Sequence, residues 1–170
     1  MNPKTDRRPA EFNTVLRAQK DYPRSCGLPT TSSILTLRGQ IKISDLRAGD
    51  KVITRDSGTA QLLAIDIDTA TGPMVKVQSG ALGDATPPTD VVIPAETELF
   101  LRDSLVHAYL GKSSALVRVT DLIDKKMIKP CTARVEMAYL TFALPHILYV
   151  DGLEISSGLT PETFQHARSA

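Results

Sequence analysis

From residue 32 onward, apolar and polar residues alternate in short runs. "SSILTL" and "QIKI" stand on either side of "RG", "KVITRD" and "AQLLAIDIDTA" follow, and Gly, Pro or Asp punctuates the series. Because successive side chains of a strand point to opposite faces, these runs predict β-strands, and the first two predict a hairpin. "SDLRAGD" predicts one helical turn over residues 44–49, capped by Ser44 and ended by Gly49.

The same pattern continues to about residue 158. Further strands are predicted in "MVKVQSGALG", "DVVIP", "TELFL", "ALVRVTDLI", "ARVEMAYLTFAL" and "HILYVDGLEIS", whereas "SLVHAYLG" fits either a helical turn or a strand. Short strands that recur about every ten residues, with turn residues between them, are typical of an all-β sandwich or barrel. We therefore expect an all-β domain.

The first 25 residues differ from this pattern. They are polar and contain "PAEFNTVLRAQK", a segment with helical spacing of apolar residues in which Pro9 suits a helix start. A disordered terminus is the alternative. We expect an N-terminal arm or leader over residues 1–25 with at most one short helix, a β domain over 26–160, and a C-terminal tail over 161–170.

Composition narrows the classes of function. Hydrophobic residues are 42% of the chain, charged residues 23%, and the formal net charge is +1, which argues against a general nucleic-acid binder. No apolar run has the length of a transmembrane helix and the N-terminus lacks the apolar core of a secretory signal, so we expect no membrane partner and a cytoplasmic location at synthesis. Two cysteines and three histidines without close spacing predict no metal site and no other cofactor.

"TSSILTLRGQIKISDLRAGDKVITRDSG" resembles the opening of a Hint domain, the fold of hedgehog autoprocessing domains and inteins. It is most similar to a bacterial branch common in alphaproteobacterial proteins, in which a Cys precedes "T-x-x-G" and "D-L-x-x-G-D-x-V-x-T-x-D-x-G". The matching positions are Thr36, Gly39, Asp45, Leu46, Gly49, Asp50, Val52, Thr54, Asp56 and Gly58. "VQSGALGD", "VIPAETELFL" and "VEMAYLTFALPHILYVDGLEISSG" resemble later blocks, so the resemblance covers about residues 26–160.

The resemblance implies a compact Hint-like β fold and self-processing chemistry. In such a site a Cys or Ser attacks the carbonyl of the preceding residue, so that the amide becomes a thioester or ester, and a His protonates the leaving nitrogen. Inteins then use a terminal Asn to release the downstream segment. The resemblance therefore implies three site residues: a nucleophilic Cys or Ser, a proton-donating His and, for splicing, a terminal Asn.

Cys26 is the candidate nucleophile, one position from the place that the spacing to Gly39 indicates. It is either the residue that attacks at Ser25–Cys26 or a small packed thiol. Cys131, which follows Pro130 at a predicted strand start, is expected in the core, and a disulfide between the two cysteines is not favoured.

The candidate proton donors depart from the branch. Glu96 stands where the branch carries its His; it would be a general acid only if buried, and otherwise it is a solvated charge at a strand edge. His146 lies near the branch's "D-R-H-E" segment and is either a displaced catalytic residue or a structural one. Ser104 and His107 have the spacing of a Thr-x-x-His block, but in a different element, and we interpret this as coincidence.

The terminal Asn has no counterpart, because the chain's asparagines are Asn2 and Asn13. Asp66 and Asp68 share one face of a predicted strand, which fits a polar outer face or a cation site. The sequence therefore predicts a Hint-fold domain with a degenerate site, acting as a structural or binding module with an unspecified protein partner or larger assembly. Self-cleavage at Ser25–Cys26 is the alternative, and an unrelated all-β domain is the third interpretation.

Overall fold

The computed structural model describes residues 27–102, 106 and 113–158. Strands in these ranges form two antiparallel sheets, ordered β1-β10-β6-β7 and β3-β2-β4-β11-β12-β8-β9, with β5 beside β4. The elements are β1 (Leu28–Pro29), β2 (Ser33–Thr36), β3 (Gly39–Lys42), the 3₁₀ helix η1 (Ile43–Asp45), β4 (Lys51–Thr54), β5 (Gly58–Gln61), β6 (Ala64–Val77), β7 (Val91–Pro94), β8 (Glu98–Arg102), β9 (Ser114–Arg118), the 3₁₀ helix η2 (Val119–Leu122), β10 (Ile128–Thr141), β11 (Ile147–Val150) and β12 (Leu153–Ser156). The all-β prediction is confirmed.

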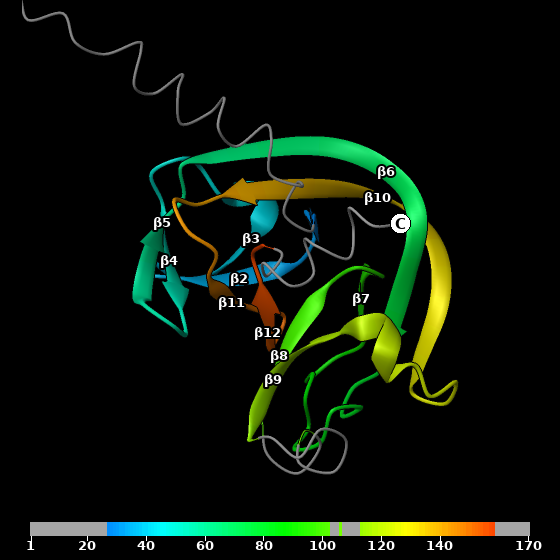
Figure 1. Ribbon diagram of the computed structural model, residues 1–170. Coiled ribbons are helices and arrows are strands. Elements are labelled where there is room, and N and C mark those ends of the chain that lie inside the picture. Colours follow the sequence, from blue (N-terminus) through cyan, green and yellow to red (C-terminus); the bar gives the residue numbers. More distant parts are fainter. Residues whose placement is uncertain (1–26, 103–105, 107–112, 159–170) are drawn as a thin grey trace, which may run out of the picture.

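The longest elements are β6 and β10, which pair with each other along 14 residues each. Both strands curve, so that the ribbon they form arches over the smaller strands (Figure 1). The prediction of two separate strands on either side of "TGP" is wrong, because β6 continues through Gly72 and Pro73. A proline is tolerated in a strand where its missing N–H leaves no partner unsatisfied, and the Pro73 carbonyl still accepts the N–H of Ala95 at 3.1 Å.

The predicted hairpin of "SSILTL" and "QIKI" is confirmed as β2 and β3. Its turn is held by Thr36, whose hydroxyl donates to the Gly39 carbonyl at 2.8 Å and accepts the N–H of Arg38 at 3.1 Å. Gly39 has φ +95°, a left-handed conformation that favours glycine. The first motif residues therefore serve to reverse the chain.

The predicted helical turn over residues 44–49 is shorter than expected and begins earlier, as η1 (Ile43–Asp45). Ser44 lies inside it and caps nothing, since the capping position is Lys42 and no side chain bonds there. Gly49 does take a left-handed conformation, at φ +94°. Its N–H donates to the Leu62 carbonyl at 2.7 Å, so this backbone bonds to a neighbouring segment instead of extending a helix.

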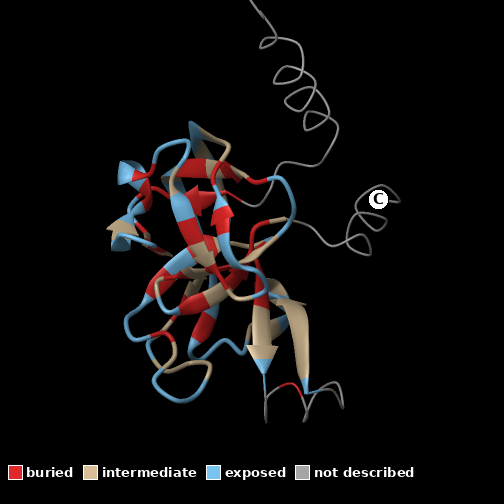
Figure 2. Ribbon diagram, turned by 90° about the vertical axis from the view of Figure 1, so that its left-hand side faces the viewer, coloured by how far each residue is buried: buried red, intermediate tan, exposed pale blue. Residues whose placement is uncertain are grey.

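The core lies between the two sheets and is filled by aliphatic side chains. Figure 2 shows the buried positions on the central strands and the exposed ones mainly in the connecting loops. The largest fully buried side chains are Ile34, Ile43, Leu62, Ile93, Leu99, Leu148, Leu153, Ile155, Val52, Val75, Val77 and Val106. Burying one such side chain stabilises a fold by about 1.5–3 kcal/mol, so alternating apolar positions specify which face of each strand turns inward.

Several predicted features fall outside the described residues: the arm over 1–25, the tail over 161–170, and His107. Cys131, expected in the core at a strand start, is instead half-buried within β10. The expectation was wrong because β10 begins earlier, at Ile128, and this part of the strand lies on the outer ribbon. In the described part of the chain, no helix has both the length and the apolar character needed to cross a membrane.

Candidate functional site

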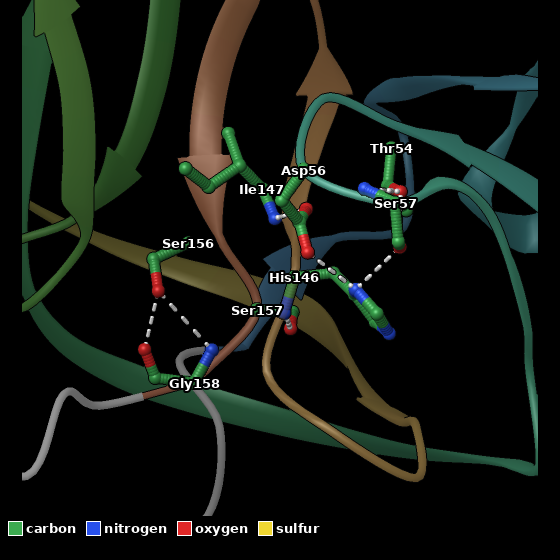
Figure 3. Close-up of polar contacts among 8 residues, drawn as sticks. All are labelled: Thr54, Asp56, Ser57, His146, Ile147, Ser156, Ser157 and Gly158. Carbon is green, nitrogen blue, oxygen red and sulfur yellow. Dashed lines mark hydrogen bonds and ion pairs between the residues drawn. The ribbon is translucent and has the colours of Figure 1, made fainter.

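The turn between β4 and β5 gathers the polar residues at the end of the motif. The Thr54 hydroxyl lies 2.9 Å from the Ser57 hydroxyl and accepts the Ser57 N–H at 3.3 Å. Gly58 follows with φ +77°, which allows the chain to reverse tightly into β5. This local bonding fixes the turn and directs the side chains of Asp56 and Ser57 toward the start of β11 (Figure 3).

His146 immediately precedes β11 and contacts that turn through its ring. Its Nδ1 atom lies 2.8 Å from Asp56 Oδ2 and 3.0 Å from Ser57 Oγ, and the other Asp56 oxygen accepts the Ile147 N–H at 2.9 Å (Figure 3). The His146 side chain is 11% exposed and the Asp56 side chain 39%. One carboxylate therefore binds both the ring and the backbone at the start of β11.

The other side of His146 is fixed by the end of β12. The His146 N–H donates to the Ser157 hydroxyl at 2.8 Å, and the Ser157 N–H donates to the His146 carbonyl at 2.8 Å. The Phe142 ring lies edge-on to the imidazole, with centroids 5.8 Å apart at 87°. Ser156, which is buried, donates its hydroxyl to the Gly158 carbonyl. His146 is thus held by three chain segments: its ring contacts the β4–β5 turn and Phe142, and its backbone is bonded to Ser157.

The electrostatics of the pair are set by competing effects on Asp56. Burial raises the pKa of this carboxyl, but the Ile147 N–H, the hydrogen bond to His146 and its positive charge together lower the pKa below its ordinary value of 3.8. Asp56 is therefore ionised at neutral pH and acts only as an acceptor.

This arrangement is not a serine-nucleophile triad. In such a triad the nucleophile and the carboxylate bond to opposite ring nitrogens, whereas Ser57 and Asp56 both approach Nδ1 of His146. No described residue forms a hydrogen bond with Nε2. The ring therefore does not link Asp56 to Ser57 in the way that a triad requires.

The turn between β7 and β8 contains the other candidate donor. Glu96 is exposed there, so the burial that a general acid would need is absent. Two residues on, Glu98 is only 5% exposed, and its Oε2 has no hydrogen-bond partner among the described residues. Thr97 between them is fully buried, and its carbonyl accepts the Val119 N–H at 2.9 Å. The buried carboxylate beside this turn is Glu98, the first residue of β8, which the sequence did not single out.

Comparison with known proteins now identifies the fold. The sequence model described as the Hint domain matches residues 26–162. This chain belongs to the Hint domain family. No curated protein matches it in sequence.

Solved Hint-fold structures resemble it at low identity. A DnaB intein from Synechocystis sp. PCC 6803 matches with a TM-score of 0.55 and 13% identity, covering 80% of this chain and 100% of that one. An intein-like domain from Clostridium thermocellum matches with a TM-score of 0.52 and 13% identity, covering 79% and 99%. The TvoVMA intein matches with 0.55 and 10%, covering 79% and 99%. Identities this low show a shared fold alone.

Most residues of the Hint motif in this chain support the fold and do not contact His146. Leu46 and Val52 are buried in the core, and Asp45 is exposed on η1. Asp50 accepts the Arg47 N–H and a guanidinium N–H of Arg38, both at 2.9 Å. These residues shape the first hairpins of the Hint fold. Of the motif, the end that contains Thr54 and Asp56 is the part that reaches His146.

The expected nucleophile of this Hint domain, Cys26, lies outside the described residues. The next residue, Gly27, is buried against Tyr139, and a Cβ placed there would come 2.9 Å from that ring. Asp66 and Asp68 lie exposed on β6, and no group of three metal-ligating side chains occurs among the described residues.

The sequence indicated His146 as a candidate donor and Asp56 as a motif position. It did not indicate Ser57, Ser157 or Glu98 as site residues. For Ser57, the signal was its place in the "T-x-D-S-G" turn. Alternation gave no signal for Glu98, because Thr97, Glu98 and Leu99 are buried in succession.

Proposed function

We propose that this protein is a non-splicing Hint domain of the alphaproteobacterial type, with a degenerate site, acting as a structural or binding module. The observation that carries the proposal is the exposed position of Glu96, which stands where that branch carries its donor His. A general acid has to reach hydrogen-bond distance of the leaving group, and an exposed turn carboxylate is poorly placed for this. The lack of any Asn after Asn13 supports the absence of splicing.

Such a module binds a protein partner or takes its place in a larger assembly. The balanced net charge of +1 disfavours nucleic acid as the partner. Residues 1–25 then serve as a tether and 161–170 as a tail, on either side of the domain. We propose that the module needs no cofactor and is located in the cytoplasm when it is synthesised.

The intact mass of the freshly purified chain tests the proposal. The full chain is incubated with and without dithiothreitol and its mass followed over days. The mass of all 170 residues should persist in both samples. A fragment that begins at Cys26 would overturn the inactive assignment.

Self-processing at Ser25–Cys26 is the second candidate, favoured by the 2.8 Å contact between Asp56 and His146. In that reaction the Cys26 thiol gives its proton to Nε2 of neutral His146, which becomes an imidazolium, and its sulfur attacks the Ser25 carbonyl carbon. The Ser25–Cys26 C–N bond then breaks, and the new amine takes a proton from the His146 imidazolium. Added thiol would exchange with the thioester and release residues 1–25.

Matched variants separate the two candidates. Under self-processing, Cys26→Ala abolishes thiol-dependent cleavage, and His146→Gln slows it by roughly 10²- to 10⁴-fold, the usual contribution of a general acid. Cys131→Ala is the control for a thiol elsewhere in the domain and should leave the rate unchanged. If the wild-type chain stays intact, the second candidate fails.

A further inference from the structure

We propose that Asp56 is a positioning residue that keeps the proton of neutral His146 on Nδ1 and so presents Nε2 as the reactive nitrogen. The use of that nitrogen in cleavage rests on the second candidate function above. The location of the proton follows from the contacts alone and holds whether or not the chain cleaves itself.

The two oxygens of Asp56 belong to a carboxylate and can only accept hydrogen bonds. One oxygen accepts the Ile147 N–H at 2.9 Å, and the other lies 2.8 Å from His146 Nδ1. A bare lone pair on Nδ1 would face a negatively charged oxygen and be repelled. The neutral imidazole therefore carries its hydrogen on Nδ1, because the bond made by one ring nitrogen determines the state of the other.

Ser57 and Thr54 agree with this assignment. With Nδ1 protonated, Ser57 Oγ at 3.0 Å is a second acceptor for the same hydrogen. The Ser57 hydroxyl is then free to donate to Thr54 Oγ1 at 2.9 Å. All donors in this chain of bonds point the same way, from the ring through Ser57 to Thr54, so no two hydrogens oppose each other.

The backbone bonds of His146 and the Phe142 ring restrict the orientation of the imidazole, so that Nδ1 stays beside Asp56. His146 exchanges two main-chain bonds of 2.8 Å with Ser157, and Phe142 contacts the ring from the side. A half-turn of the ring would place a carbon opposite Asp56 and lose a charge-assisted bond. The turn residue therefore fixes a ring 90 positions away in sequence, and Nε2 is left for other partners.

Nitrogen-15 NMR of the full-length chain tests the proton location. Two-bond couplings from the ring carbons' hydrogens distinguish an imidazole protonated on Nδ1 from one protonated on Nε2, measured at a pH where the ring is neutral. His146→Gln assigns the signals among the three histidines. The wild-type ring should be protonated on Nδ1. Asp56→Ala should move the hydrogen to Nε2, the form that free imidazole side chains favour, and the matched control Ser57→Ala should leave it on Nδ1.

The wild-type spectrum decides the matter even if a variant fails to fold. A His146 ring protonated on Nε2 in the wild-type chain, or an unchanged ring in folded Asp56→Ala, would overturn the assignment. Where cleavage is observed, Asp56→Ala should slow it by roughly 10- to 100-fold, the range found when a metal-bound histidine loses the carboxylate that orients it. An intact wild-type chain with an Nδ1 proton would refute the cleavage function while sustaining the role of Asp56.

Discussion

The turn between β4 and β5 and the turn between β7 and β8 both contain polar residues of the Hint blocks, but their polar groups are satisfied differently. In the first turn, Asp56 binds the His146 ring and the Ile147 N–H. In the second, Glu96 is exposed, and Glu98, which begins β8 directly after the turn, is buried with an oxygen that has no partner among the described residues.

From this comparison we infer that the partners of a carboxylate, more than its burial, determine whether it stabilises this fold. The Asp56 side chain is 39% exposed and fully bonded, whereas Glu98 is 5% exposed with one oxygen unsatisfied. Burying a polar atom without a partner costs free energy, and a hydrogen bond to that atom offsets the cost. Removing the two carboxylates should therefore change stability in opposite directions.

The largest effect is expected for Asp56→Ala. The variant removes the acceptor of two hydrogen bonds, one of them to a ring nitrogen, and should lower the free energy of unfolding by roughly 1–2 kcal/mol after allowance for solvent exposure. Urea denaturation measures the loss. Asp90→Ala is the control: it removes an acceptor of the Ser79 N–H and an ion pair with Lys76, both at 3.0 Å, at a more exposed position, and should cost less. Equal losses in the two variants would show that the bonds of Asp56 stabilise the fold no more than those of an exposed carboxylate.

Glu98→Met tests the opposite side of the comparison. Methionine has a similar volume without charge, so the free energy of unfolding should rise by about 1 kcal/mol, as when buried charges are replaced by apolar groups. Glu98→Gln keeps the shape and a polar head, and should give a smaller gain. A marked loss of stability on Glu98→Met in urea denaturation would mean that the carboxylate is bonded in solution.

Acid should weaken the first turn in a defined pH range. Bonds to Ile147 and His146 outweigh burial and hold the pKa of Asp56 below 3.8 in the folded chain. A carboxylate with a lowered pKa adds stability above its unfolded pKa, about 3.9, and loses it as the pH falls through the folded value. The difference in melting temperature between wild type and Asp56→Asn should be complete near pH 5 and shrink below about pH 4. A difference that stays constant down to about pH 2 would contradict the shift.

The smallest effect is expected for Glu96→Met, the matched substitution two residues from Glu98. Because Glu96 is exposed, the change in free energy should stay within about 0.5 kcal/mol. The same urea measurement gives the answer. A change comparable to that of Glu98→Met would remove the distinction between the two carboxylates.

Much of the fold could be predicted from local pattern. The β2–β3 hairpin and the strands β4, β7, β11 and β12 follow alternating or apolar runs that are visible in the chain. The break expected at Gly72 and Pro73 was wrong because pairing with β10 over 14 residues outweighs two unfavourable strand residues. The helical turn was misplaced because Gly49 bonds to Leu62, a contact across the fold.

The candidate site was predictable only as single residues. His146 was selected and Asp56 stood in the motif, but their contact joins positions 90 residues apart. Ser157 binds the backbone of His146 from the end of β12, and nothing in "EISS" indicates that partner. Glu96 was selected and Glu98 was not, because a family motif identifies a position without specifying how deeply it is buried.

The sequence by itself determined the all-β class and, through the order of its motif blocks, membership of the Hint family. Alternation and turn chemistry are properties of neighbouring residues, so they can be read along the chain. Only the tertiary structure decided which polar side chains are satisfied. The order β2-β4-β11 brings the first turn beside His146, and hydrogen bonding and desolvation depend on groups that meet across such an order, far apart in sequence.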